Sequence, residues 1–131
     1  MSNIPQYAST PNLGICKLTT AETNRASPTN IVSLFTAGSN GSRVERITIN
    51  TTATSALGAV WLWIQRSGTY YLYTEFQVSA KTGSATVLDF NLQTDMTAVG
   101  NIGLILKSGD VLYASTTITQ NMNVFAEGAD F

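Results

Sequence analysis

The chain has 131 residues, of which 44% are hydrophobic and only 11% charged, and its formal net charge is −1. That length favours a single domain whose core forms without disulfide or metal cross-links. The basic residues are scattered along the chain rather than clustered, which excludes the electrostatic signature of a nucleic-acid-binding surface.

From the N-terminus, the sequence first predicts an extended arm over residues 1–12 and then one β domain over residues 13–131. The arm contains prolines and small polar residues, and its candidate contact residues are Ile4, Pro5 and Tyr7. The rest of the chain alternates short runs rich in Thr, Val, Ile and aromatic residues with Gly, Asn and Ser turns. Strands are predicted at 13–20, 31–37, 43–52, 57–65, 70–79, 86–92, 102–107, 110–118 and 122–128.

This spacing of roughly ten residues is typical of an antiparallel sandwich or barrel. We therefore predict an all-β fold with about 8–9 strands. Alternation assigns faces within the clearest strands, because successive side chains point to opposite sides. It places Ile47 and Ile49 on the inner face, together with Leu88, Phe90 and Leu92. In 70–79 it places Tyr70, Leu72, Phe76 and Val78 on one face, and Tyr71, Tyr73, Glu75 and Gln77 on the other.

The strand at 57–65 departs from one-sided alternation, since Trp61 and Trp63 make its second face apolar as well. Two interpretations stay open. Either the strand is covered on both sides, or the two tryptophans lie at an interface with a partner, where Trp is enriched. With Tyr71 and Tyr73 they form a candidate contact patch. The loop at 21–30 contributes a further candidate contact residue, Arg25.

Residue types restrict the chemistry that the chain can perform. Without histidine, neither a Ser–His nor a Cys–His nucleophile pair can form, and the lone Cys16 cannot complete a usual zinc site. We expect Cys16 to be a small buried hydrophobe. The carboxylates follow no glycosidase spacing, and Asp89, Asn91 and Asp95 do not match an EF-hand calcium loop. We therefore predict no catalytic residue, no cofactor and no metal, hence a protein that is not an enzyme.

Two further patterns concern location. The longest apolar stretch, Ala59 to Ile64, is too short to span a bilayer, so no membrane partner is expected. The N-terminal residues Met1 to Pro5 contain neither a charged region nor an apolar region of a secretory signal. We expect synthesis in a cytoplasm, with any exit inside a larger particle.

Several stretches, taken in order, carry a family resemblance. They are Asn3-Ile4-Pro5-Gln6-Tyr7, Ala21-Glu22-Thr23-Asn24-Arg25, Leu34-Phe35-Thr36-Ala37-Gly38, Gly41-Ser42-Arg43-Val44-Glu45-Arg46-Ile47, Leu106-x-x-Gly109-Asp110-x-Leu112-x-Ala114 and Val124-Phe125-Ala126-x-Gly128-x-Asp130-Phe131. Together they resemble small proteins encoded beside the major capsid protein of tailed phages, namely capsid cement or decoration proteins. The resemblance covers essentially the whole chain. It depends on the ordered set and on the matching length, because no single motif is specific.

The resemblance implies a β-sandwich of jelly-roll type that binds the outer surface of a capsid and cements neighbouring major capsid subunits. The implied partners are the major capsid protein and further copies of the chain, as a dimer or trimer, without direct nucleic-acid contact. The implied location is the virion surface, after synthesis in the cytoplasm of a bacterial host. The resemblance transfers no catalytic or contact residue, so the contact candidates named above come from the residues alone.

Two other readings remain. One is a glycan- or receptor-binding β-sandwich of a phage head fibre or tail, in which exposed Trp61, Trp63, Tyr71 and Tyr73 would stack on sugar rings. The other is a coat protein that forms the shell itself.

Overall fold

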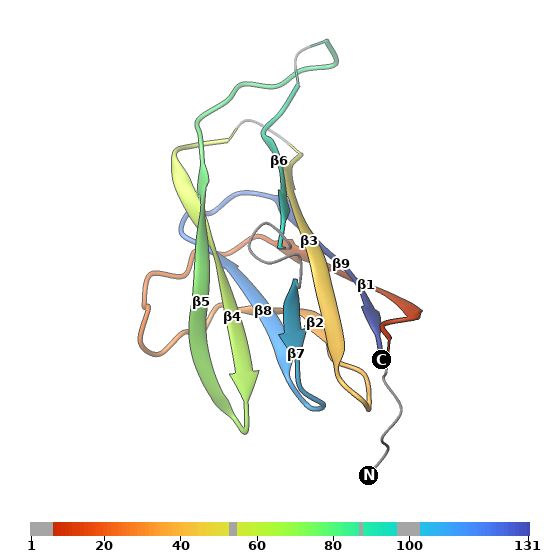
Figure 1. Cartoon of the computed structure of the whole chain (residues 1–131). Helices are drawn as coiled ribbons and strands as arrows, with labels where there is room; N and C mark the ends of the chain where they lie inside the picture. The colour runs from red at the N-terminus through yellow and green to blue at the C-terminus, as the bar shows by residue number, and fades with distance from the viewer. Residues whose placement is uncertain (1–6, 53–54, 87, 97–102) are drawn as a thin grey trace.

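The computed structural model describes residues 7–52, 55–86, 88–96 and 103–131, and the regular secondary structure within them consists of strands (Figure 1). This confirms the all-β prediction. The strands of the described residues are β1 (Thr10–Leu18), β2 (Val32–Thr36), β3 (Ser42–Thr51), β4 (Gly58–Arg66), β5 (Thr69–Val78), β6 (Asn91–Asp95), β7 (Leu104–Leu106), β8 (Val111–Thr116) and β9 (Met122–Asp130).

The strands form two antiparallel sheets. Sheet I has the order β1-β9-β3-β6, with β7 also paired to β3, and sheet II has the order β2-β8-β4-β5. The pairs are nested along the chain: β1 pairs with β9, β2 with β8, β3 with β6 and β7, and β4 with β5. This nesting is the arrangement of a jelly roll. The predicted antiparallel sandwich of jelly-roll type is therefore confirmed.

The core lies between the sheets and forms one cluster of buried side chains. Ile47 and Ile49 of β3 are almost fully buried in it, as their alternation predicts. Sheet II contributes residues such as Phe35 and Leu62. Cys16 is buried in the same cluster, and desolvation raises the pKa of its thiol to about 12. It is a small core hydrophobe, as expected.

The first strand begins earlier than predicted. Residues 10–12 pair with β9 in an unbroken register from Thr10, opposite Asp130, to Leu18, opposite Met122. Proline does not prevent this, because Pro11 lies in an edge strand where a missing N–H is tolerated. The predicted arm at 1–12 therefore overlaps the sheet by three positions. Of its candidate contact residues, Tyr7 is 77% exposed, whereas Ile4 and Pro5 lie outside the described residues.

The sixth strand lies later than predicted. It covers Asn91–Asp95 instead of 86–92. Phe90 and Leu92 pack against the core as expected, but Leu88 is 81% exposed, so its predicted inward position is wrong. The alternation before residue 90 belongs to a connection and not to a strand, and period-two hydrophobicity alone does not distinguish the two.

The two long sides of the sandwich differ. At the side formed by β1 and β2 the sheets meet closely, since a Cβ placed on Gly14 would clash with the backbone oxygen of Leu34. At the opposite side, seen at the left of Figure 1, β5 is the edge strand of sheet II and pairs only with β4 among the described strands. The candidate site lies on and around this second side.

Candidate contact surface

A β-bulge determines which side chains of β5 reach each face of sheet II. Leu62 of β4 pairs with Thr74, but the next residue, Trp63, pairs with Leu72, so Tyr73 has no direct partner. Residues directly opposite each other in an antiparallel pair share a face. Leu72 therefore lies on the outer face with Trp63, whereas Phe76 lies on the inner face.

The bulge overturns one prediction from alternation. Tyr70 and Leu72 do not share a face with Phe76 and Val78, because the extra residue reverses the alternation halfway along the strand. The register instead gathers a second apolar group on the outer face of sheet II, which we call the aromatic layer. Its members are Trp61, Trp63, Tyr70, Leu72 and Tyr113.

Ring contacts connect the aromatic layer. The rings of Trp61 and Trp63 meet edge to face with centroids 6.1 Å apart, and those of Tyr70 and Tyr113 do so at 5.2 Å. Trp63 Nε1 donates a hydrogen bond of 3.0 Å to the hydroxyl of Ser115 on β8. The indole N–H of Trp61 is also buried, but it has no hydrogen-bond partner within the described residues.

The connection between β1 and β2, loop 19–31, crosses this outer face from β8 over β4 to β5. At one end Ala21 forms a bridge with Thr116, and the amide of Glu22 donates to the Thr116 carbonyl at 2.7 Å. Farther along, the guanidinium carbon of Arg25 lies 4.8 Å from the ring centroid of Trp61. Arg25 also forms an ion pair of 2.7 Å with Glu75 of β5. The loop thus places a cation over Trp61.

Glu22 organises this loop from inside. Only 2% of the residue is exposed, and its carboxylate accepts backbone N–H groups from Asn24 at 2.9 Å and from Thr29 and Asn30 at 2.6 Å. The amide of Asn30, with smaller contributions from Asn24 and Thr29, holds the pKa of Glu22 below its ordinary value despite desolvation. The sequence does not reveal this role of Glu22, because a lone Glu in a loop carries no pattern that indicates burial.

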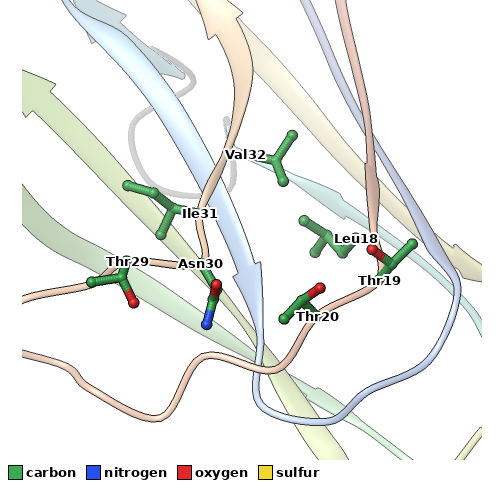
Figure 2. Close-up of a pocket in the computed structure, with 7 residues that line it drawn as sticks. All are labelled: Leu18, Thr19, Thr20, Thr29, Asn30, Ile31 and Val32. Atoms are coloured by element: carbon green, nitrogen blue, oxygen red, sulfur yellow. The ribbon is translucent and has the colours of Figure 1, made fainter.

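A hollow of about 220 Å³ lies at the base of the loop (Figure 2). Figure 2 shows Leu18, Thr19 and Thr20 on one side of it and the segment 29–32 on the other. Asn30 joins the two ends of the loop by donating a side-chain hydrogen bond of 3.1 Å to the Ala21 carbonyl. No ionisable side chain lines the hollow, so it offers no group for acid–base chemistry.

The structure separates the four aromatic residues predicted to form one patch. Trp61 and Trp63 expose only 4% and 1% of their surface, so the burial interpretation is correct and these rings are not available to a partner or a sugar. Arg25 lies on Trp61 and pairs with Glu75 of the same chain. Tyr71 and Tyr73, in contrast, are 57% and 46% exposed.

Tyr71 and Tyr73 lie along the free edge of sheet II, and we call this region the β5 edge. Tyr71 pairs with Ile64 and, with Ile64 and Arg66, lines a hollow of about 300 Å³. Tyr73 lies beside a second hollow of about 430 Å³, whose wall includes Phe76 and Met96. An edge strand presents unpaired backbone N–H and C=O groups, so this region offers hydrogen bonds and aromatic area together.

The turn beside the β5 edge is held by an ion pair. Arg66 donates two hydrogen bonds to the carboxylate of Asp110, one from Nε at 2.7 Å and one from a terminal nitrogen at 2.6 Å. The backbone amide of Lys107 donates a third hydrogen bond to the same carboxylate, at 2.9 Å. The hydrogen bond from Arg66 is the largest contribution that lowers the pKa of Asp110. Arg66 belongs to β4 and Asp110 to the turn before β8, so no local pattern in the sequence predicts this pair.

Within the described ranges, no group of three or more Cys, Asp or Glu side chains is arranged to hold a metal ion. Asp95, considered above for calcium, forms an ion pair of 2.9 Å with Arg46. The same part of the chain contains no helix that is long and apolar enough to cross a membrane.

Comparisons with known proteins leave the family open. No protein-family model matches the chain, and no curated protein matches it. Among solved structures, the chain is similar to Eiger TNF from S. frugiperda, with 11% sequence identity, coverage of 93% of this chain and 94% of that chain, and a TM-score of 0.48. A likeness of this extent carries no argument about function.

Proposed function

We propose that the chain is a structural virion protein that binds the outer surface of a phage capsid and cements neighbouring major capsid subunits. The observation that carries the proposal is the β5 edge, where Tyr71 and Tyr73 remain exposed on the edge strand of sheet II, in a sandwich with one continuous core. The family resemblance suggests the major capsid protein as the partner, and the β5 edge is a surface suited to contact with a protein.

The physical features of this edge fit a protein partner. Tyrosine combines a large contact area with few rotatable bonds, and it is enriched in the energetically important parts of interfaces. Ligand recognition by strand addition uses such an edge, with main-chain hydrogen bonds providing affinity and side-chain pockets providing specificity. The hollows beside Tyr71 and Tyr73 would receive side chains of the capsid protein.

The proposal includes a location and an assembly state. The chain is synthesised in the cytoplasm of a bacterial host and joins the capsid at its outer surface, as a dimer or trimer, without catalytic activity or a cofactor. The partner is the major capsid protein. Neither nucleic acid nor a membrane takes part.

Burial of Trp61 and Trp63 removes the main support for the glycan-binding alternative. It required Trp61 and Trp63 to be available for stacking on sugar rings, but both are buried and Arg25 of loop 19–31 lies over Trp61. Only Tyr71 and Tyr73 of the four rings remain open to a sugar.

Quantitative mass spectrometry of purified particles from the phage that encodes the chain tests the proposal. We expect a copy number of the same order as that of the major capsid protein. A copy number typical of a fibre or tail component would favour receptor binding. Complete absence of the chain from the particle would contradict the cement function.

A further inference from the structure

The inner face of sheet II is less covered near the hairpin between β4 and β5, at the lower end of Figure 1, than in the middle of the sandwich. Along β4, the inward side chains of Val60 and Leu62 are fully buried, Ile64 is half-buried, and the Arg66 side chain is 53% exposed. Tyr71 lies directly opposite Ile64, and therefore on the same face, yet it is exposed. The hollow lined by Ile64, Arg66 and Tyr71, which we call the Tyr71 hollow, is thus open to solvent.

A buried carboxylate holds Arg66 in place beside this hollow. The register between β4 and β8 pairs Gln65 with Val111, and its continuation brings Arg66 opposite Asp110. Asp110 is only 1% exposed, and its carboxylate accepts two hydrogen bonds from Arg66 and one from the Lys107 amide. The guanidinium therefore has a fixed position, whereas the carboxylate behind it is not accessible to a ligand.

Arg66 keeps hydrogen-bonding capacity for a ligand. A guanidinium has five N–H groups, and Asp110 takes one from Nε and one from a terminal nitrogen. The other terminal nitrogen has no hydrogen-bond partner within the described residues. An incoming carboxylate can therefore pair with the outer edge of the guanidinium, in the bidentate geometry that Arg favours.

The charge and polarity of the surroundings favour an organic anion. Lys107 is exposed on the turn between β7 and β8, close enough for its charge to act on Asp110. The cluster of Arg66, Lys107 and Asp110 therefore has a net positive charge. Ile64 and the ring of Tyr71 supply an apolar wall beside the guanidinium. A carboxylate with a hydrocarbon stem suits this combination, because the stem can pack on the wall while the charge stays on Arg66.

We infer that the Tyr71 hollow binds an acidic side chain of a protein partner, with the carboxylate on Arg66 and the methylene groups against Ile64 and Tyr71. Its volume of about 300 Å³ is at the lower limit for small-molecule pockets, so it suits one side chain rather than a cofactor. The hollow belongs to the β5 edge. The identity of the partner as the major capsid protein therefore rests on the proposed function, whereas recognition of the carboxylate does not.

Nuclear magnetic resonance of the isotope-labelled full-length chain tests the inference with a matched pair of probes. N-acetyl-glutamate N-methylamide carries the carboxylate, and N-acetyl-glutamine N-methylamide has nearly the same shape without the charge. We expect saturable shifts of the Arg66 Nε–H and Tyr71 ring signals, with a dissociation constant on the order of 10 mM for the glutamate probe. The glutamine probe should bind about tenfold more weakly, because hydrogen bonds between charged groups are stronger.

Acetate is the third probe and tests the apolar wall. It carries the same carboxylate but lacks the hydrocarbon stem of glutamate. It should bind at least about fourfold more weakly than the glutamate probe, since each buried methylene group contributes to affinity.

A double variant tests the role of the guanidinium. Arg66→Gln combined with Asp110→Asn removes the guanidinium without leaving a buried carboxylate unpaired. The side-chain amide introduced at position 110 can still accept the Lys107 N–H. This double variant should bind the glutamate probe no better than the parent chain binds the glutamine probe. Thermal unfolding followed by circular dichroism checks that it is folded.

A surface variant repeats the test without touching the ion pair. Lys107→Gln keeps the backbone amide that contacts Asp110 and should weaken binding of the glutamate probe by about twofold, because one nearby positive charge is lost. Lys81→Gln is the matched control, since Lys81 is also exposed but lies beyond β5 at the opposite end of the sandwich (Figure 1). It should leave the affinity unchanged.

Any of five results would overturn the inference. They are the absence of saturable shifts up to about 100 mM probe, equal affinities for the glutamate and glutamine probes, equal affinities for the glutamate probe and acetate, parent-like binding by the double variant, and equal effects of the two Lys→Gln variants. Each concerns the isolated chain, so none of them changes the copy number expected in purified particles. Conversely, absence of the chain from those particles would exclude the capsid protein as the source of the side chain and leave the carboxylate site unaffected.

Discussion

The guanidinium of Arg25 lies over the indole of Trp61, 4.8 Å from the ring centroid, and the same group forms an ion pair with Glu75 at 2.7 Å. One loop residue therefore connects β4 and β5 on the outer face of sheet II. The contact places a loop side chain over Trp61, on the second face of β4, without a further layer of secondary structure.

Arg25→Ala should expose Trp61 and shift its fluorescence emission to longer wavelength. We expect a loss of about 1 kcal/mol in unfolding free energy, because the cation–π contact is partly exposed to solvent. Arg25→Lys keeps the charge but lacks the planar guanidinium, so its effect should be intermediate. Denaturant titration with fluorescence detection measures both variants, and an unchanged emission spectrum for Arg25→Ala would contradict the covering role.

Trp63→Phe should destabilise the protein more than Trp61→Phe. Trp63 loses its hydrogen bond to the fully buried Ser115, whereas the Trp61 N–H has no partner to lose within the described residues. An unsatisfied buried hydroxyl costs about 1–3 kcal/mol. Chemical denaturation of the two single variants measures the difference.

The control for this comparison is the double variant Trp63→Phe, Ser115→Ala. Removing both members of the hydrogen bond should recover part of the lost stability, because no polar group then remains unsatisfied. Equal costs for the two single Trp→Phe variants would show that the bond to Ser115 contributes little.

Glu22→Gln should loosen loop 19–31, because the NH2 group that replaces one carboxylate oxygen cannot accept a backbone N–H, whether it faces Asn24 or faces Thr29 and Asn30. The expected loss is about 1–3 kcal/mol at neutral pH. The folded state lowers the pKa of Glu22 below its ordinary value of 4.5. Its contribution is therefore complete above pH 4.5 and is lost as the pH falls through the lowered pKa.

The pH dependence of the unfolding free energy provides a second test of this prediction. The stability difference between the parent chain and Glu22→Gln should be constant near neutrality and shrink in acid. Glu45→Gln is the matched control, since Glu45 is an exposed glutamate paired with Arg43. A difference that stays constant down to the acid transition would rule out the carboxylate as the group that organises the loop.

The double variant Tyr71→Thr, Tyr73→Thr should lose capsid binding with little loss of stability. Both tyrosines are about half exposed, and threonine suits a strand. We expect affinity for capsids of the source phage to fall more than tenfold, as for aromatic interface residues elsewhere. Co-sedimentation with capsids that lack the chain measures it. Leu88→Thr, at a residue that is 81% exposed outside the β5 edge, serves as the control and should bind normally.

Local patterns in the chain were enough to predict the class of fold and the approximate position of the strands. Alternation and turn residues act between neighbours in the chain, so they identify Ile47 and Ile49 as inward-facing and place Gly, Asn and Ser turns between the strands. One such turn contains Asn40-Gly41, where Gly41 has φ of 86°. The two apolar faces of the strand at 57–65 were also evident from the sequence, but they were compatible with either burial or a partner interface.

Strand pairing and the path of loop 19–31 decided that the tryptophans are buried, and they set the composition of the outer face of sheet II. A bulge opposite the Leu62–Trp63 step reversed the faces of β5, and it depends on how two strands pair, which local alternation does not encode. Arg25 and Glu22 acquired their roles only when loop 19–31 crossed sheet II. Ile15 and Phe125 came to lie side by side on the outer face of sheet I only when β1 and β9 paired in register. In each case the residues that meet are far apart in the chain, so their contact is a property of the packed sheets.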